Sequence, residues 1–170
     1  MNILHEKSNL TRLAQSHKGF EPFNYDFSVD WAIELLEKGI ATENIQILAS
    51  FPKPTDAWEI KSYVHKVLKE FDLEEFEDEE AIQNMCYYYI LSIINEEGNL
   101  KSHLEKLSYF CIKSDYESSI FPFYLLKFSW EDLQDLGTSY HYDGVTLQNF
   151  NTVVRKEAKI WMENFEKKSQ

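Results

Sequence analysis

Apolar residues recur at steps of three and four positions through most of this chain, and this spacing limits what the chain can fold into. A period near 3.6 places apolar side chains on one face of an α-helix, whereas a half-buried strand alternates every second residue. Glycine and proline, which tight turns between strands require, number only 5 and 4 in 170 residues. The sequence therefore predicts an all-α protein with few connections and long elements.

Capping residues and glycines indicate where the helices begin and end. Ser8 is expected to cap a short helix, and Asp56 with Glu59 three residues later fits a capping box. Pro122 suits a first helical turn, where its missing N–H costs little. Residues 1–27 are interpreted as a short helix followed by an extended aromatic segment. The remaining helices are predicted over residues 28–38, 42–50, 56–71, 81–95, 99–111 and 119–136, and from Thr146 onwards.

The chain is interpreted as one all-α domain over residues 1–170, with six to eight helices. Its length suits a single domain or two very small ones. Aligning Gly39 with Gly98 matches several apolar positions, which suggests two stacked three-helix units, residues 28–86 and 87–145, with solenoid-like packing. Any two amphipathic helices that flank a glycine align this well, so unrelated helices are the alternative.

The formal net charge of −12 excludes some classes of partner. Nucleic-acid affinity comes largely from Lys and Arg side chains that neutralise phosphates, and anionic membranes attract basic segments. The sequence therefore predicts no nucleic-acid and no membrane binding, and a protein with a basic surface is the natural electrostatic partner. The alternative is that the charge serves only solubility.

The sequence contains no segment typical of export or of membrane insertion. The first residues lack the apolar core of a signal peptide, and the longest uncharged stretch, residues 81–95, is shorter than the roughly 20 residues that cross a bilayer. A cytoplasmic location is therefore expected. Cys86 and Cys111 lie in apolar helical segments and are expected to be buried thiols.

Familiar catalytic and ligand motifs are absent from the sequence. There is no glycine-rich phosphate loop, no His-Glu-x-x-His, no Cys-x-x-Cys and no nucleophile elbow, so no cofactor and no metal site is predicted. His141, within Tyr-His-Tyr-Asp-Gly, is the most interesting histidine, because Asp143 could orient its imidazole for general base catalysis. The alternative is a turn packed on the core.

Residues 70–80 differ most clearly from the rest of the chain in their density of acidic residues, with eight carboxylates in eleven positions. Three interpretations compete. The first is a solvated connection whose last residues favour the next helix N-terminus. The second is a surface for a basic partner, with apolar anchors inside a charged rim. The third is a divalent-cation site. No glycine breaks the run, so an EF-hand is excluded. The candidate partner-binding residues are Glu74, Glu75, Phe76, Glu77, Asp78, Glu79 and Glu80.

A resemblance adds to this interpretation. The stretch Trp31 to Gly39, followed by Glu43 to Ser50, resembles a recurrent pattern in small helical bacterial proteins of uncharacterised function, in which a Leu-Leu-x-x-Gly helix end leads into a short helix with Leu-Ala. It implies the helical arrangement and no site residues. Some acidic helical proteins of this size are immunity proteins that neutralise a toxin.

The sequence favours a non-enzymatic protein-binding module, in its sharpest form an immunity-type protein that binds a basic toxin domain through residues 74–80. The alternative is a hydrolase or transferase of unknown substrate with a site near His141 and Asp143; no catalytic residue is assigned. A third hypothesis is a subunit of an oligomer that associates through Tyr87, Tyr88 and Tyr89, since tyrosine is favoured at interfaces.

Overall fold

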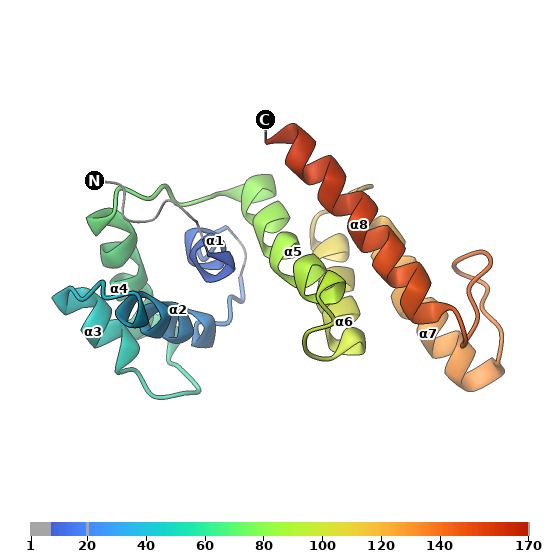
Figure 1. Cartoon of the computed structure of the whole chain (residues 1–170), viewed down its shortest axis with the longest axis horizontal. Helices are drawn as coiled ribbons and strands as arrows, with labels where there is room; N and C mark the ends of the chain where they lie inside the picture. Colours follow the sequence, from blue (N-terminus) through green and yellow to red (C-terminus); the bar gives the residue numbers. More distant parts are fainter. Residues whose placement is uncertain (1–7, 20, 170) are drawn as a thin grey trace. The chain divides into compact units, whose positions relative to one another are not determined.

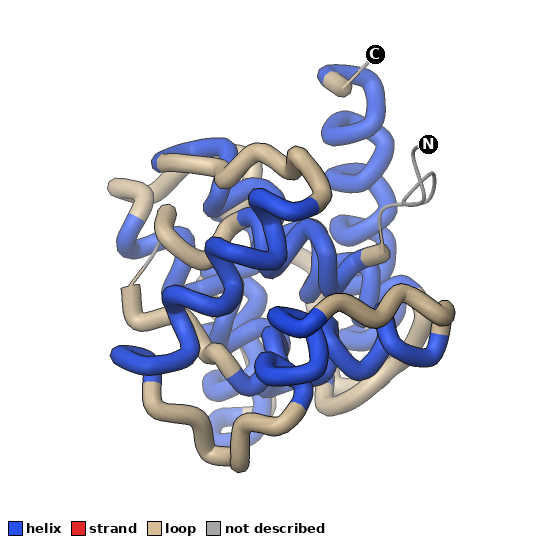
Figure 2. The backbone as a smooth tube through the Cα atoms, turned by 90° about the vertical axis from the view of Figure 1, so that its left-hand side faces the viewer, coloured by secondary structure: helices blue, strands red, loops and turns tan. Residues whose placement is uncertain are grey.

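The computed structural model describes residues 8–19 and 21–169, so the expectations for residues 1–7 and Phe20 lie outside the described part. The described residues form eight α-helices and no strand, which confirms the predicted all-α class (Figures 1 and 2). The helices are α1 (Asn9–Gln15), α2 (Asp26–Glu37), α3 (Glu43–Ala49), α4 (Ala57–Glu70), α5 (Asp78–Ile94), α6 (Leu100–Lys113), α7 (Phe121–Leu136) and α8 (Phe150–Lys168).

Side-chain caps fix several helix starts where the sequence placed them. The side chains of Ser8, Thr42 and Asn99 each accept a hydrogen bond from the backbone N–H three residues ahead, at the starts of α1, α3 and α6. Asp56 accepts from the backbone N–H of Trp58 at 2.8 Å and caps α4. Each of these bonds satisfies a donor that the first helical turn would otherwise leave unpaired.

Several helix starts differ from the prediction. α5 begins at Asp78 and not at residue 81, and α7 begins at Phe121 and not at residue 119. A helix was expected from residue 28, but α2 begins at Asp26, and Ser28 is a buried residue of its first turn. The last helix was expected from Thr146, but α8 begins at Phe150. Thr146 and Asn149 exchange two hydrogen bonds between side chain and backbone, at 2.7 and 3.2 Å. Thr146 therefore forms a separate turn ahead of the helix and does not cap the helix itself.

The contacts of the chain group into two compact units, residues 1–88 and 89–170, with the boundary inside α5. In the first unit α3 packs on both α2 and α4, and α1 also packs on α2 and α4. Their shared core contains Trp31, Leu35, Ile45, Leu48, Ile60 and Val64, all with fully buried side chains. The Trp31 indole N–H donates to Thr11 Oγ1 at 3.0 Å, so this large side chain is buried with its polar atom satisfied.

The second unit is built on α7, which packs against α6 on one side and α8 on the other. Its buried residues include Leu107, Phe123, Leu126 and Val154. Gly137 ends α7 in the left-handed conformation at φ 73°, as glycine commonly does at a helix C-terminus. The predicted repeat of residues 28–86 and 87–145 stays a prediction.

Candidate functional site

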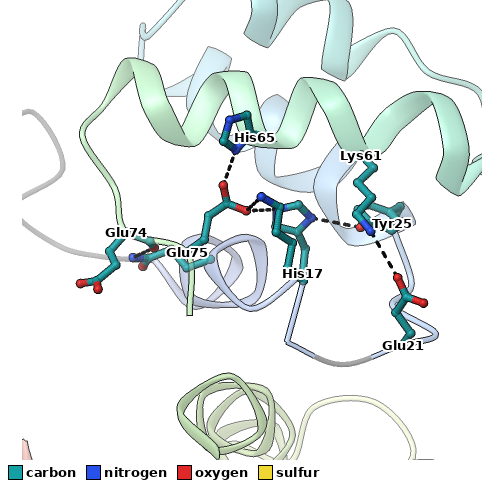
Figure 3. A network of polar contacts seen from close by, with 9 residues as sticks. His17, Glu21, Tyr25, Lys61, His65, Glu74 and Glu75 are labelled. Atoms are coloured by element: carbon teal, nitrogen blue, oxygen red, sulfur yellow. Dashed lines mark hydrogen bonds and ion pairs between the residues drawn. The ribbon is translucent and has the colours of Figure 1, made fainter. Parts of the chain in front are cut away.

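One carboxylate in the first unit gathers three cationic or potentially cationic side chains. Glu75 lies in the connection between α4 and α5, and its side chain is only 16% exposed. Its Oε2 is 2.7 Å from His17 Nε2 and 2.9 Å from Lys18 Nζ, and its Oε1 contacts His65 Nδ1 (Figure 3). Glu75 therefore joins the segment after α1, the α4–α5 connection and α4 itself.

Backbone contacts hold this connection against α1. The Phe76 N–H donates to the carbonyl of Gln15 at 2.7 Å, and Gln15 Nε2 donates to the carbonyl of Glu74 at 2.9 Å. Just beyond, Gly19 packs on the first turns of α5: a Cβ at this position would lie 2.1 Å from the Cβ of Ala81. The connection is thus a fixed element, although it has no secondary structure of its own.

The protonation states of the network follow from burial and hydrogen bonding. Burial raises the pKa of Glu75, but hydrogen bonds from Lys18, His65 and His17 outweigh burial and hold the pKa at about 2. Burial lowers the pKa of His17 from 6.5, although Glu75 opposes this shift. The imidazole of His17 is therefore neutral at pH 7, and a neutral imidazole has one N–H donor and one acceptor nitrogen.

The partners of His17 decide which nitrogen carries the proton. Glu75 is an acceptor, so His17 Nε2 donates to it, and Nδ1 accepts from the hydroxyl of Tyr25 at 3.0 Å. Burial raises the pKa of Tyr25 to about 12, so this hydroxyl stays a donor at neutral pH. The chain Tyr25–His17–Glu75 is therefore a saturated hydrogen-bond network that positions groups, and it offers no phenolate nucleophile.

An open pocket of about 980 Å³ adjoins this network. One wall is a single face of α4, where Trp58, Lys61, Ser62 and His65 follow the helical spacing of three and four. The opposite wall comes from the segment between α1 and α2 and includes Lys18, Glu21, Pro22, Phe23 and Tyr25.

The rim of this pocket has two unusual features. The side chain of Trp58 is 93% exposed, the most exposed of the large hydrophobic residues in the described chain. Lys61 Nζ lies 3.2 Å from Glu21 Oε1, a pair in which the glutamate side chain is 76% exposed (Figure 3). Such an exposed ion pair contributes little stability, because water screens both charges.

A smaller pocket of about 300 Å³ lies beside the acidic connection and shares His65 with the first pocket. His65, Lys69, Asp72, Leu73, Glu74 and Glu75 form its lining. Trp58 and His65 are seven residues apart on α4, which is about 10 Å along the helix axis. Both pockets and the acidic connection therefore lie within the reach of one protein interface, which typically buries about 800 Å² on each partner.

The residues predicted to bind a partner have different environments. Glu74, Glu77, Asp78, Glu79 and Glu80 are exposed. Glu75 is engaged by its three partners, and Phe76 is 8% exposed within the first unit. Asp78, Glu79 and Glu80 form the first turn of α5, where the helix dipole stabilises negative charge.

The residues of the alternative hypotheses lie in other surroundings. His141 Nε2 is 3.5 Å from Asp132 Oδ2 of α7, whereas Asp143 is exposed in the following turn. Arg12 lies over the ring of Tyr87 at 4.6 Å, and Phe27 packs on Tyr88 at 5.2 Å. Tyr89 is buried and packs on Phe110.

Cys86 and Cys111 are buried thiols, as expected. Burial raises the pKa of Cys111 to about 11, so its reactive thiolate form is rare at neutral pH. Within residues 8–19 and 21–169, no three His, Cys, Asp or Glu side chains are grouped so that they could hold a metal ion. Nor does any helix described there have both the length and the apolar character that a membrane crossing needs.

Sequence analysis missed His17, Tyr25, Trp58 and Lys61 as members of a site. One signal for Trp58 was present. The buried residues of α4 are Ile60, Val64, Val67 and Leu68, and position 58 lies off this apolar stripe. A large aromatic residue on the polar face of an amphipathic helix indicates an exposed contact residue.

Comparisons with known proteins add no assignment. No protein-family model matches the chain, and neither the curated proteins nor the solved structures gave a match.

Proposed function

We propose that this chain is a non-enzymatic protein-binding module that docks a basic partner through its first unit. The observation that carries the proposal is a set of five exposed carboxylates, on the α4–α5 connection and the first turn of α5, beside contacts that hold this connection in place. Glu74 and Glu77 to Glu80 face solvent, while the neighbouring Glu75 and Phe76 bind that connection to the unit. A surface that is already ordered loses little conformational entropy on binding.

Charge supports the same proposal. The chain has a net charge of −12, and the exposed carboxylates concentrate part of it on one segment. Complementary charge speeds the encounter of two proteins and makes its rate depend on salt, whereas apolar anchors mainly set how long the complex lasts. The exposed indole of Trp58 is an anchor of this kind, since tryptophan is enriched among residues that dominate binding energy.

The finer form of the proposal is an immunity-type protein whose partner is a basic toxin domain. It is supported by the acidic charge and by the exposed carboxylates. In this form the partner should inhibit growth when it is expressed alone, and co-expression of this chain should restore growth.

The test is affinity capture from a lysate of the source cells at low salt, followed by association kinetics with the purified captured protein. The first variant replaces Glu74, Glu77, Glu79 and Glu80 with serine, leaving Glu75 and its contacts intact. The matched control replaces Glu105, Asp135, Glu163 and Glu166, which are exposed carboxylates of the second unit, and so removes the same charge elsewhere.

We expect the first variant to associate about tenfold more slowly than the control, with a flatter salt dependence. Trp58→Ala should instead raise the dissociation rate. Equal association rates for the two four-serine variants would show that the net charge, and not this connection, attracts the partner, and the proposal would fail.

A further inference from the structure

We propose that the pocket between α4 and the α1–α2 segment binds a small ligand in which a planar aromatic ring carries a carboxylate or phosphate group. This inference uses the pocket alone and does not depend on the exposed carboxylates of the α4–α5 connection. Its volume of about 980 Å³ lies at the upper end of the range typical of small-molecule sites.

Aromatic side chains form the walls on both sides of the pocket. Phe23 and Tyr25 pack edge to face, with ring centroids 4.9 Å apart, and Trp58 stands on the opposite wall. The Phe23 and Tyr25 rings also pack on His17, at 6.4 and 5.8 Å, so they are held in position. Rings fixed in this way present flat surfaces on which an aromatic ligand can stack or pack edge-on.

Basic side chains gather at this pocket, although the chain as a whole is strongly acidic. Lys18, Lys61 and His65 all line it, against one lining carboxylate, Glu21. The chain has 29 acidic and 17 basic residues, so an excess of basic side chains around one cavity is contrary to its composition. A ligand carboxylate or phosphate placed there would accept charge-assisted hydrogen bonds.

Lys61 is the cation that a ligand can engage at the lowest cost. Lys18 and His65 are already engaged by Glu75, which holds its negative charge down to a pKa of about 2. Lys61 pairs instead with the exposed Glu21, at 3.2 Å. Because that pair is screened by water, a ligand anion can replace Glu21 with little loss.

The test is a titration of the full ¹⁵N-labelled chain with four probes. Binding is monitored through the NMR signals of the indole and backbone N–H groups. The probes are 2-naphthoate, 2-naphthyl phosphate, the neutral isostere 2-naphthamide, and acetate. Trp58→Phe assigns the indole signal of Trp58. We expect one of the two anionic naphthyl probes to shift that signal and the amide signals of residues 23–25 and 57–65. It should bind about tenfold more tightly than 2-naphthamide.

Lys61→Met should abolish this preference for the anion, and Lys61→Arg should retain it. The control is Lys66→Met, because Lys66 is exposed on α4 over the Tyr63 ring and does not line the pocket. The tighter of the two anionic probes identifies the group as carboxylate or phosphate.

Three results would overturn the inference. Equal binding of 2-naphthoate, 2-naphthyl phosphate and 2-naphthamide would show a purely apolar pocket. Shifts of the same size with acetate would show that the aromatic ring contributes nothing. Unchanged Trp58 and pocket signals at millimolar concentrations of both anionic probes would show that the pocket does not take this class of ligand. The serine variants of the acidic connection should leave all four titrations unchanged, which separates this outcome from that of the proposed function.

Discussion

Each of the two units places a histidine against a carboxylate, and the two pairs differ in almost every physical respect. In the first unit His17 has a fully buried side chain and lies 2.7 Å from Glu75, which Lys18 and His65 also contact. In the second unit His141 is 45% exposed and 3.5 Å from Asp132. The comparison shows that the number of converging elements and the exclusion of water, and not the residue types, make such a pair important to the structure.

The largest expected difference concerns the loss of the carboxylate charge. Glu75→Gln should destabilise the first unit by about 2–3 kcal/mol, because three donors lose their charged acceptor in a half-buried place. Asp132→Asn should cost less than about 1 kcal/mol, since its histidine is exposed. Hydrogen exchange read by mass spectrometry measures the two units separately. Similar losses from the two variants would remove the distinction between the pairs.

The second prediction concerns how tightly the segment after α1 packs on α5 in the first unit. Gly19→Ala should cost about 1–3 kcal/mol, because the new methyl group collides with the Cβ of Ala81 and neither atom belongs to a flexible side chain. In the second unit Gly137→Ala meets open space, and its cost of about 1 kcal/mol comes only from the left-handed backbone. Urea unfolding of both variants ranks the two costs. A smaller loss for Gly19→Ala would show that the segment after α1 can move away from α5.

A third prediction concerns pH. The pKa of His17 is lowered from 6.5, so protonation favours the unfolded chain, and stability present above pH 6.5 is lost as the pH falls below it. The pKa of Glu75 is lowered from 4.5 to about 2, so its contribution is lost between these two values. Thermal unfolding should therefore show a decline in stability below pH 6.5 that steepens below pH 4.5.

The control for this prediction is His17→Gln, whose amide can still donate to Glu75. It should remove the decline between pH 6.5 and 4.5 and leave the steeper part below. The explanation would be wrong if His17→Gln left the profile unchanged.

The smallest expected effect is that of Trp58 on stability. Trp58→Ala should change the free energy of unfolding by less than about 0.5 kcal/mol, as is usual for an exposed position. Leu136→Ala, at a side chain 64% exposed in the second unit, should behave alike. Acrylamide quenches the fluorescence of exposed tryptophans, so Trp58 should account for most of the quenching among the four tryptophans. A loss of stability above 1 kcal/mol would mean that the indole packs on the protein and is not presented to a partner.

The sequence predicted the helices well because helix signals are local. The apolar spacing of α4 and the caps at Ser8 and Asp56 depend on residues within one or two turns, and these features appear as expected. Thr146 misled because the same hydroxyl chemistry serves a turn as readily as a cap.

The site could not be predicted in the same way, because its members meet only through tertiary packing. His17 and Glu75 are 58 positions apart, and nothing local distinguishes Glu75 from the other seven carboxylates of residues 70–80. His65 lies ten positions before Glu75, among the lysines of α4, and the local sequence gives no sign that it contacts a carboxylate. Only the burial of Glu75 against α1 and α4 separates it from its neighbours.

The long separation between His17 and Glu75 also has a consequence for how the chain emerges during synthesis. A ribosome that adds roughly 5–20 residues per second leaves His17 without its carboxylate for several seconds. Throughout that interval α1 and α2 are present without the α4–α5 connection, which packs on the first unit only later. The first unit can therefore complete its polar network only after the α4–α5 connection has been made, and any nascent chain shorter than this exposes the surface that Glu75 and Phe76 will cover.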